Sequence, residues 1–279
     1  MDWTGRVFEV RIDGVGHGGV FIGRHDGRVV FVRRALPGER VRVTVTEDRG
    51  GSFCRAEVTD VLEASPDRVA DVCPVSSVGD AGCCDFSHIA VDAQRRLKGQ
   101  VLYEQLDRIA HLPRRIPVDA LPGSADGRGW RTRVRLAVDE TGRAGYRQYR
   151  SHEVVTDLRC PQAVPGMVDG IDEEVWQAGS ELSIAVDDDG RRHVVEIDPP
   201  QLTRAALHRK GRRGASARRA ARSAPRPERI VEGGGSAVQR VSGRDWLLAP
   251  TDFWQVHRSA AQAYADLVCE WSGLGAGDT

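Results

Sequence analysis

The sequence predicts a protein of more than one domain, in which a small closed β-barrel precedes a mixed α+β region. The chain has 279 residues, enough for about two domains with cores of their own. Residues 7–63 alternate apolar and charged side chains over short stretches, with no helical spacing between them. Residues 66–200 combine helical and strand patterns without regular alternation, which is typical of an α+β fold.

Composition excludes several classes of protein. Charged residues make up 29% of the chain and hydrophobic residues 40%, which excludes a fibre, a collagen and a wholly disordered chain. Forty basic side chains balance forty acidic ones, so any binding of nucleic acid must come from local patches. There is no bilayer-length apolar run and no secretory signal, so we expect a cytoplasmic protein without a membrane segment. In that reducing compartment, cysteines are ligands, nucleophiles or core residues more often than disulfides.

Five short strands are expected in the first domain, residues 1–65. Apolar and charged residues alternate over 7–12, and Asp26-Gly27 is a hairpin dipeptide between two further strands. Residues 36–39 form a turn, and a final strand covers 53–61. Five strands without an intervening helix favour an OB-like barrel, the oligonucleotide-binding type, over a sandwich.

A glycine-rich stretch in this domain fits a dinucleotide-binding pattern. Residues 14–19 read Gly-Val-Gly-His-Gly-Gly and follow a strand. The next element is a second strand, so no helix N-terminus is available for a pyrophosphate. We therefore interpret the stretch as a turn between barrel strands.

The second domain, residues 66–200, begins at the turn Ser65-Pro66-Asp67 and carries a cysteine loop. Residues 230–279 are expected to complete it and to end in a helix. The expected elements are a helix from Asp92 to about Leu112, strands at 130–138 and 145–155, a helix at 167–176, a hairpin of 183–186 with 193–197, and a helix from about His257.

Between these parts, residues 201–229 form a basic segment. It contains ten basic residues and one acidic residue, and apolar periodicity stops there. This composition predicts a solvated, flexible loop. Whether the loop also contacts RNA is left open, because a basic run needs no partner to stay in water.

Four of the six cysteines form a candidate metal site: Cys73, Cys83, Cys84 and Cys160. Four thiolates can hold a [4Fe–4S] cluster or a zinc ion, and buried thiols without a metal are the alternative. Adjacent Cys83 and Cys84 point different ways in an extended chain, so both could bind one metal group only through a tight turn. Cys54 and Cys269 lie among apolar residues and are expected in the core.

Arginines alternate along one predicted strand at Arg131, Arg133 and Arg135, with Arg147 and Arg150 on the expected partner strand. They could form one basic face for a phosphate backbone, or simply a solvated face of the sheet. Barrel aromatics, Phe8, Phe21 and Phe31, could stack on bases, although core positions are more common in so small a barrel.

Motifs in order along the chain resemble a known family. The first domain, with Gly16-His17-Gly18-Gly19 and Leu36-Pro37-Gly38-Glu39, resembles the TRAM domain, an RNA-binding barrel. Four further stretches follow in the order found in the TRAM-containing RNA uridine-C5 methyltransferases. They are Cys73 to Cys84-Asp85-Phe86-Ser87-His88, Trp130-Arg131-Thr132-Arg133, Ser151-His152 to Cys160-Pro161, and Asp252-Phe253-Trp254-Gln255-Val256.

The resemblance implies a SAM-dependent (S-adenosylmethionine-dependent) enzyme that methylates carbon 5 of a uridine in ribosomal RNA. In that family a cysteine thiolate adds to carbon 6 of uracil, carbon 5 takes the methyl group, and a base removes its proton. The target base must leave its stack to be reached. Gln255 is the position we carry over as a contact near SAM or the target base, and no catalytic residue is assigned.

Two departures from the family lead to further predictions. The family's Rossmann-like SAM domain is expected to be absent, because the sequence ends at Thr279 where that domain's first strand should begin, and the chain alone is then expected to be inactive. Ala81 replaces a family cysteine, so Cys83 is the doubtful member of the ligand set. The alternative function is a non-catalytic RNA-binding protein with a cysteine-ligated metal site.

Overall fold

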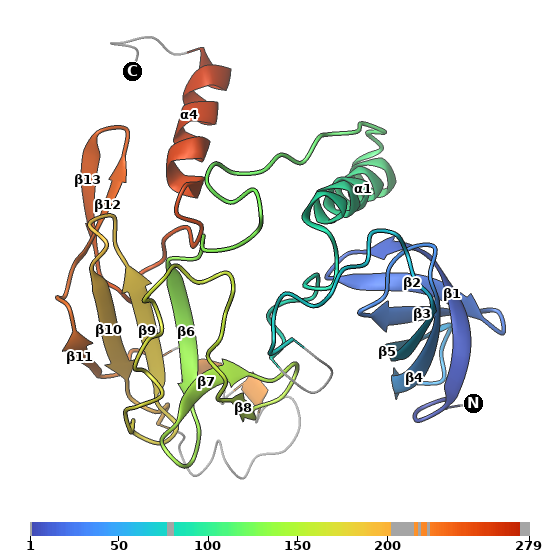
Figure 1. Ribbon diagram of the computed structural model, residues 1–279, viewed down its shortest axis with the longest axis horizontal. Coiled ribbons are helices and arrows are strands. Elements are labelled where there is room, and N and C mark those ends of the chain that lie inside the picture. The colour runs from blue at the N-terminus through green and yellow to red at the C-terminus, as the bar shows by residue number, and fades with distance from the viewer. Residues whose placement is uncertain (1, 77–80, 202–214, 217–218, 222–223, 274–279) are drawn as a thin grey trace. The chain divides into compact units, whose positions relative to one another are not determined.

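The computed structural model describes residues 2–76, 81–201, 215–216, 219–221 and 224–273 (Figure 1). The chain divides into two compact units, Met1–Ala120 and Leu121–Thr279, which we describe separately. No helix among the described residues is long and apolar enough to span a membrane.

The first unit is built on a closed five-stranded barrel, as the alternating pattern predicts. The strands are β1 (Val7–Gly16), β2 (Val20–His25), β3 (Arg28–Arg33), β4 (Arg40–Asp48) and β5 (Phe53–Glu63). Their order around the barrel is β1-β2-β3-β5-β4, and β3 pairs in parallel with β5 while the other neighbours are antiparallel. Cys54 is buried in the barrel core, as expected.

The glycine-rich stretch is the turn that the sequence predicts. β1 ends at Gly16 and β2 begins at Val20, so the chain passes from strand to strand without a helix. Gly18 and Gly19 have φ values of 84° and 77°, a conformation that L side chains rarely adopt. The glycines therefore serve the turn.

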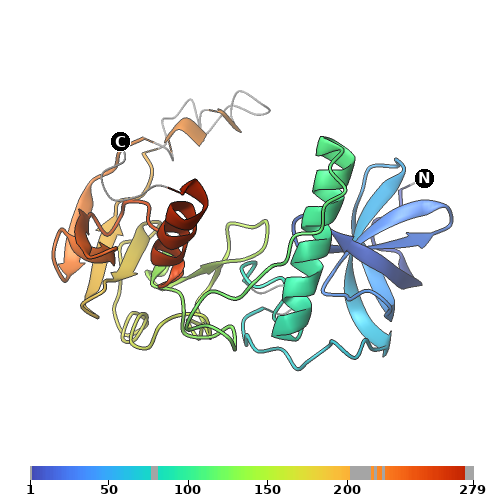
Figure 2. The same ribbon diagram turned by 90° about the horizontal axis from the view of Figure 1, so that it is seen from above.

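Helix α1 (Val91–Ala110) joins the barrel's hydrophobic core through Ala93 and Leu97, and Ile89, just before the helix, belongs to the same core (Figure 2). The first compact unit consequently runs to Ala120, beyond the boundary that the sequence places at residue 65. The expected cap, Asp92, lies inside the first turn and not at the helix start.

A buried histidine makes the first unit sensitive to acid. His88 is 1% exposed; its Nε2 donates to the Ala35 carbonyl at 3.2 Å, and its Nδ1 has no partner among the described residues. Burial, together with the nearby charges of Arg68 and Arg34, lowers the pKa of His88 from 6.5 to about 4. Between about pH 4 and pH 6.5, the His88 imidazole is therefore mostly neutral in the folded state and mostly protonated in the unfolded chain.

We expect His88 to lower the free energy of unfolding of the first unit as the pH falls. Below pH 6.5 the unfolded state binds a proton that the folded state does not, so the stability present above 6.5 is lost progressively down to about pH 4. The full loss is about 3 kcal/mol. Urea unfolding of the wild type and of His88→Leu at several pH values measures it, and equal pH dependence in the two proteins would contradict the assignment.

The second unit is built on a six-stranded antiparallel sheet. Its strands are β6 (Arg133–Val138), β7 (Ala144–Arg147), β8 (Val154–Val155), β9 (Glu181–Val186), β10 (Arg192–Ile197) and β11 (Glu228–Glu232), in the order β11-β10-β9-β6-β7-β8. A separate hairpin of β12 (Ala237–Val241) and β13 (Arg244–Leu248) is followed by helix α4 (Ala260–Ser272). The expected hairpin at 183–197 is confirmed as β9 and β10.

Three local predictions differ from the structure. Residues 167–176 form turns and not a helix, because Gly166 and Gly170 take positive φ values of 79° and 72°. Cys269 is exposed on α4 and does not lie in the core. The hairpin of β12 and β13 was not foreseen, although its turn, Ser242-Gly243, is a recognisable hairpin signal.

The end of the basic segment is ordered. Arg226 donates to Glu181 at 2.6 Å, and Arg229 to Glu196 at 2.5 Å, so β11 is held to the sheet at its edge. Residues 226–229 are therefore not part of a flexible loop, contrary to the prediction. Most of the segment, including 202–214, lies outside the described residues.

Candidate functional site

The candidate site of the second unit is a segment, residues 250–258, that lies along the start of β6. The Thr132 backbone N–H and hydroxyl both donate to the Val256 carbonyl, at 2.8 and 3.2 Å. Arg258 N–H donates to the Trp130 carbonyl at 2.9 Å, and the Trp130 and His257 rings stack with centroids 5.3 Å apart. The segment is thus fixed to the sheet through its backbone.

Arg133 lies beneath this segment and is not on the surface. Its side chain is buried, and Nη1 donates to the carbonyls of Pro250 at 3.2 Å and Asp252 at 3.0 Å. Burial lowers the pKa of this guanidinium. Its Nε and Nη2 have no hydrogen-bond partner among the described residues. Arg133 therefore holds the turn that precedes Phe253, and the predicted exposed face of three arginines is corrected.

The fixed segment presents one aromatic ring to solvent. Phe253 is 83% exposed, whereas Trp254 packs on Trp246 with ring centroids 6.4 Å apart. Gln255 is half-buried, and its amide makes no hydrogen bond within the described part of the chain. An exposed ring next to an unengaged amide can contact a planar ligand that offers both an apolar face and polar edges.

Two of the other predicted arginines, Arg135 and Arg147, lie around one carboxylate. Arg135 of β6 and Arg147 of β7 both face Glu181, at 3.9 and 3.1 Å, and Arg226 joins them at 2.6 Å. Burial alone would raise the pKa of Glu181, but these guanidinium groups hold it below its usual range. Three cations around one carboxylate leave a local excess of positive charge. Arg131 lies apart from them, over the Trp130 ring.

The cysteine loop of the first unit brings three thiols close together. The sulfurs of Cys83 and Cys84 are 3.9 Å apart, and the Cys84 thiol lies within hydrogen-bond reach of Cys73. That hydrogen bond lowers the pKa of Cys73 and raises the pKa of Cys84. Ser76 and Ser87 hold the loop, with their hydroxyls 2.7 Å apart.

These residues do not fit a four-thiolate metal group. In the first unit, Ala81 is a buried apolar residue of the same loop and offers no ligand atom from its side chain. Within the residues that the structure describes, no group of three or more histidine, cysteine, aspartate or glutamate side chains is placed to hold a metal ion. The predicted iron–sulfur or zinc site is therefore not supported, and no function is derived from it.

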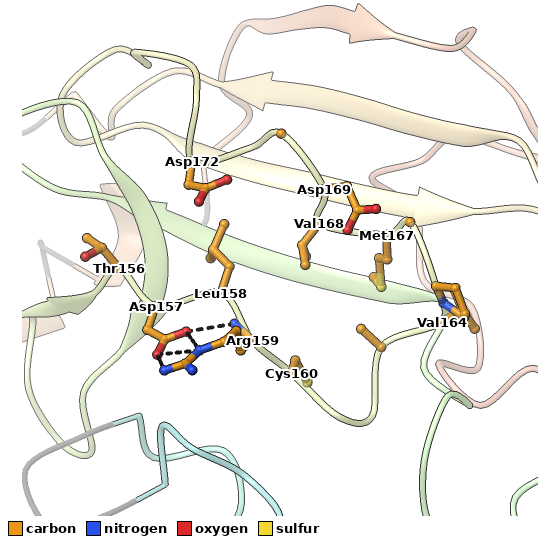
Figure 3. Close-up of a pocket in the computed structure, with 14 residues that line it drawn as sticks. Thr156, Asp157, Leu158, Arg159, Cys160, Val164, Met167, Val168, Asp169 and Asp172 are labelled. Atoms are coloured by element: carbon orange, nitrogen blue, oxygen red, sulfur yellow. Dashed lines mark hydrogen bonds and ion pairs between the residues drawn. The ribbon is translucent and has the colours of Figure 1, made fainter.

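Cys160 lies beside an open hollow in the second unit, lined by residues 156–172 (Figure 3). Asp157 accepts two hydrogen bonds from Arg159 Nε, both at 3.0 Å, and these bonds lower the pKa of its carboxyl. Asp169 and Asp172 add negative charge to the lining. With three carboxylates and one arginine, the lining has an excess of negative charge, which does not attract a phosphate backbone.

Comparisons with known proteins agree with the barrel and the fixed segment. Residues 3–59 match the TRAM domain family, and the first unit therefore contains a TRAM domain. An uncharacterized RNA methyltransferase of Corynebacterium glutamicum is 37% identical over 269 residues, covering 95% of this chain and 60% of the relative. The 23S rRNA (uracil(1939)-C(5))-methyltransferase RlmD of Alkalilimnicola ehrlichii is 37% identical over 166 residues, covering 57% of this chain and 36% of that protein. The chain is thus similar to RNA methyltransferases along most of its length and contains a TRAM domain.

A solved structure shows the same fold. The tRNA (uracil-54, C5)-methyltransferase of Pyrococcus abyssi, in complex with S-adenosyl-L-homocysteine, aligns over 96% of this chain and 65% of its own, with a TM-score of 0.55 and 17% identity. The chain spans about 60% of the length of the curated relatives it matches most fully.

These matches correct the prediction that the SAM domain is absent. The methyltransferase structure aligns over nearly the whole of this chain, and relatives match over 95% of it, so the comparisons give no support to an absent domain or to an inactive chain. The prediction rested on where the sequence ends, and an end point carries no information about the rest of a protein.

Proposed function

We propose that the protein is a SAM-dependent RNA methyltransferase that methylates carbon 5 of a uridine in cytoplasmic ribosomal RNA. The observation that carries the proposal is similarity to RNA methyltransferases along 95% of the chain, in a protein that begins with a TRAM domain. The RlmD proteins of Alkalilimnicola ehrlichii and Halomonas elongata act on uracil in 23S rRNA, which supports both the base and the RNA.

The segment 250–258 would hold the target base. The exposed Phe253 ring offers a stacking surface, and the Gln255 amide can donate to and accept from the polar edge of uracil. Arg133 keeps the turn before Phe253 in place through the carbonyls of Pro250 and Asp252. A base extruded from its stack meets a rigid contact surface there, so little conformational entropy is lost on binding.

Arginines of the sheet would bind the RNA backbone. Arg135 and Arg147 are each about half exposed and share Glu181 with Arg226, so phosphates can approach a surface with excess positive charge. Arg131, stacked on Trp130, is a further candidate contact. In this proposal Arg133 acts through the segment that it holds, and not by a surface contact with phosphate.

SAM supplies the methyl group when it is bound. Among the described residues Gln255 is the one candidate contact, and a single amide does not define a cofactor site. The sheet of the second unit is antiparallel, and the glycine-rich turn of the barrel precedes a strand, so neither provides a helix N-terminus for such a ligand. In this proposal the described residues therefore bind the RNA and position the target base.

The experiment that tests the proposal is methylation of ribosomal RNA by the full-length protein with SAM. We expect 5-methyluridine in the nuclease digest of the RNA, identified by mass spectrometry. RNA binding without any modified nucleoside would favour the alternative, a non-catalytic RNA-binding protein.

A further inference from the structure

A groove in the first unit lies outside the barrel and outside the segment 250–258. It runs between helix α1 and the chain at 115–118, and its volume of about 820 Å³ falls within the roughly 300–1,000 Å³ of typical ligand sites. Its lining includes Arg95, Arg96, Gly99, Tyr103 and Arg115.

The floor of the groove includes a glycine in the middle of the helix. Arg95, Gly99 and Tyr103 follow one another at four-residue spacing, which places them in a row on one face of α1. A Cβ atom at position 99 would lie 3.6 Å from the Ile116 carbonyl oxygen and 3.7 Å from the Val118 side chain. Both distances are ordinary van der Waals contacts, so the chain at 115–118 packs closely against this part of the helix.

The walls of the groove carry a cation against an aromatic ring. The Arg115 guanidinium carbon lies 4.6 Å from the centre of the Tyr103 ring, and Arg115 has no carboxylate partner within the described residues. A cation and a ring in contact form a surface on which a nucleic-acid base can stack. The apolar residues Ile116, Pro117 and Val118 close the opposite side.

Two further arginines flank this pair. Arg96 donates to both carboxylate oxygens of Asp67 at 2.8 Å, and Arg95 bonds Asp92 one turn before it. Asp67, Asp92 and Arg96 are exposed, and such ion pairs are weak in water, so a phosphate can exchange with the carboxylates. The lining holds three arginines and Glu104, and although Asp92 and Asp67 pair with Arg95 and Arg96, Arg115 remains a cation beside the ring.

We propose that this groove binds a single-stranded segment of RNA. A base stacks at the Tyr103–Arg115 pair, and neighbouring phosphates pair with Arg95 and Arg96. The inference rests on the proposed function in that RNA is the ligand, and it adds a binding site separate from the place of methylation. The cation–ring pair favours a nucleotide over an acidic peptide, which requires no surface for stacking.

Fluorescence anisotropy of the full-length protein with a labelled uridine-rich single strand tests the site. Tyr103→Ala is expected to weaken binding about tenfold, because stacking on one base is lost, while Tyr103→Phe keeps wild-type affinity. Arg96→Gln is expected to reduce the slope of log affinity against log salt by about 0.7, the value for one phosphate contact on a single strand. Arg108→Gln, on another face of the same helix, is the matched control and should leave the affinity almost unchanged.

The outcomes separate this proposal from the function on which it rests. If the wild type binds RNA but Tyr103→Ala and Arg96→Gln behave as Arg108→Gln does, the groove is not an RNA site and the proposed function stands. If the wild type binds no RNA, both proposals fail. Displacement of the RNA by polyglutamate, with no dependence on Tyr103, would identify an acidic-peptide site and overturn the assignment to RNA.

Discussion

Glu39→Ala is expected to destabilise the barrel unit by about 3–5 kcal/mol, the cost of removing one partner from a buried ion pair. Glu39 is fully buried, and its carboxylate accepts from Arg68 Nε at 2.6 Å and Nη2 at 2.8 Å. It also accepts from the backbone N–H groups of Leu36 and Ser65, at 2.8 and 3.1 Å. Alanine would leave Arg68 Nε and both backbone N–H groups without this acceptor, together with an uncompensated cation, while Nη2 would keep the Arg34 carbonyl.

Hydrogen–deuterium exchange of peptides from β1 to β5 measures this change without interference from the second unit. Glu9→Ala is the matched control, because Glu9 is about half exposed and pairs with Arg40 and Arg42 on the barrel surface. Removing an exposed pair should cost less than about 1 kcal/mol. Similar losses in the two variants would show that Glu39 does not hold the barrel together.

Phe253→Ala is expected to lower the rate of RNA methylation by about tenfold to a hundredfold, because the stacking surface for the target base is lost. Its stability should stay the same, since the side chain is 83% exposed. Gln255→Ala is expected to reduce the rate as well, through loss of the amide that faces the polar edge of the base. Either variant should lower kcat more than it raises KM, because other contacts hold the RNA.

Val175→Ala provides the control for these variants. Val175 is an apolar residue of the same unit, 84% exposed and outside the segment 250–258. Its replacement should leave methylation unchanged. If Phe253→Ala and Val175→Ala gave the same activity, the assignment of the segment to base binding would be contradicted.

The sequence predicted the elements whose signals are local. Apolar alternation in residues 7–63 is enough to indicate the barrel, and the stripe of Leu97 and Val101 indicates α1. The prediction of a helix at 167–176 was wrong, because Gly166 and Gly170 place backbone turns within a stretch of helical apolar spacing. Cys269 shows the same limit, since apolar neighbours in sequence do not ensure burial in the fold.

The candidate site depends on contacts that local patterns cannot show. Alternation correctly places Arg133 and Arg135 on β6, whereas Arg131 lies before the strand. The segment that buries Arg133 comes from more than a hundred residues further along. The groove beside α1 went unpredicted for a related reason. Residues 115–118 have no periodicity of their own, and only their packing on the helix reveals the pairing of Arg115 with Tyr103.

The central claim, that the protein methylates carbon 5 of uridine, is tested most directly by following the hydrogen that methylation replaces. Ribosomal RNA carrying [5-³H]uridine is incubated with the full-length protein and SAM, and tritium released to water is counted. The proposed function predicts release that requires SAM and is matched by the 5-methyluridine formed. Tight RNA binding with no release above a control without protein would contradict it.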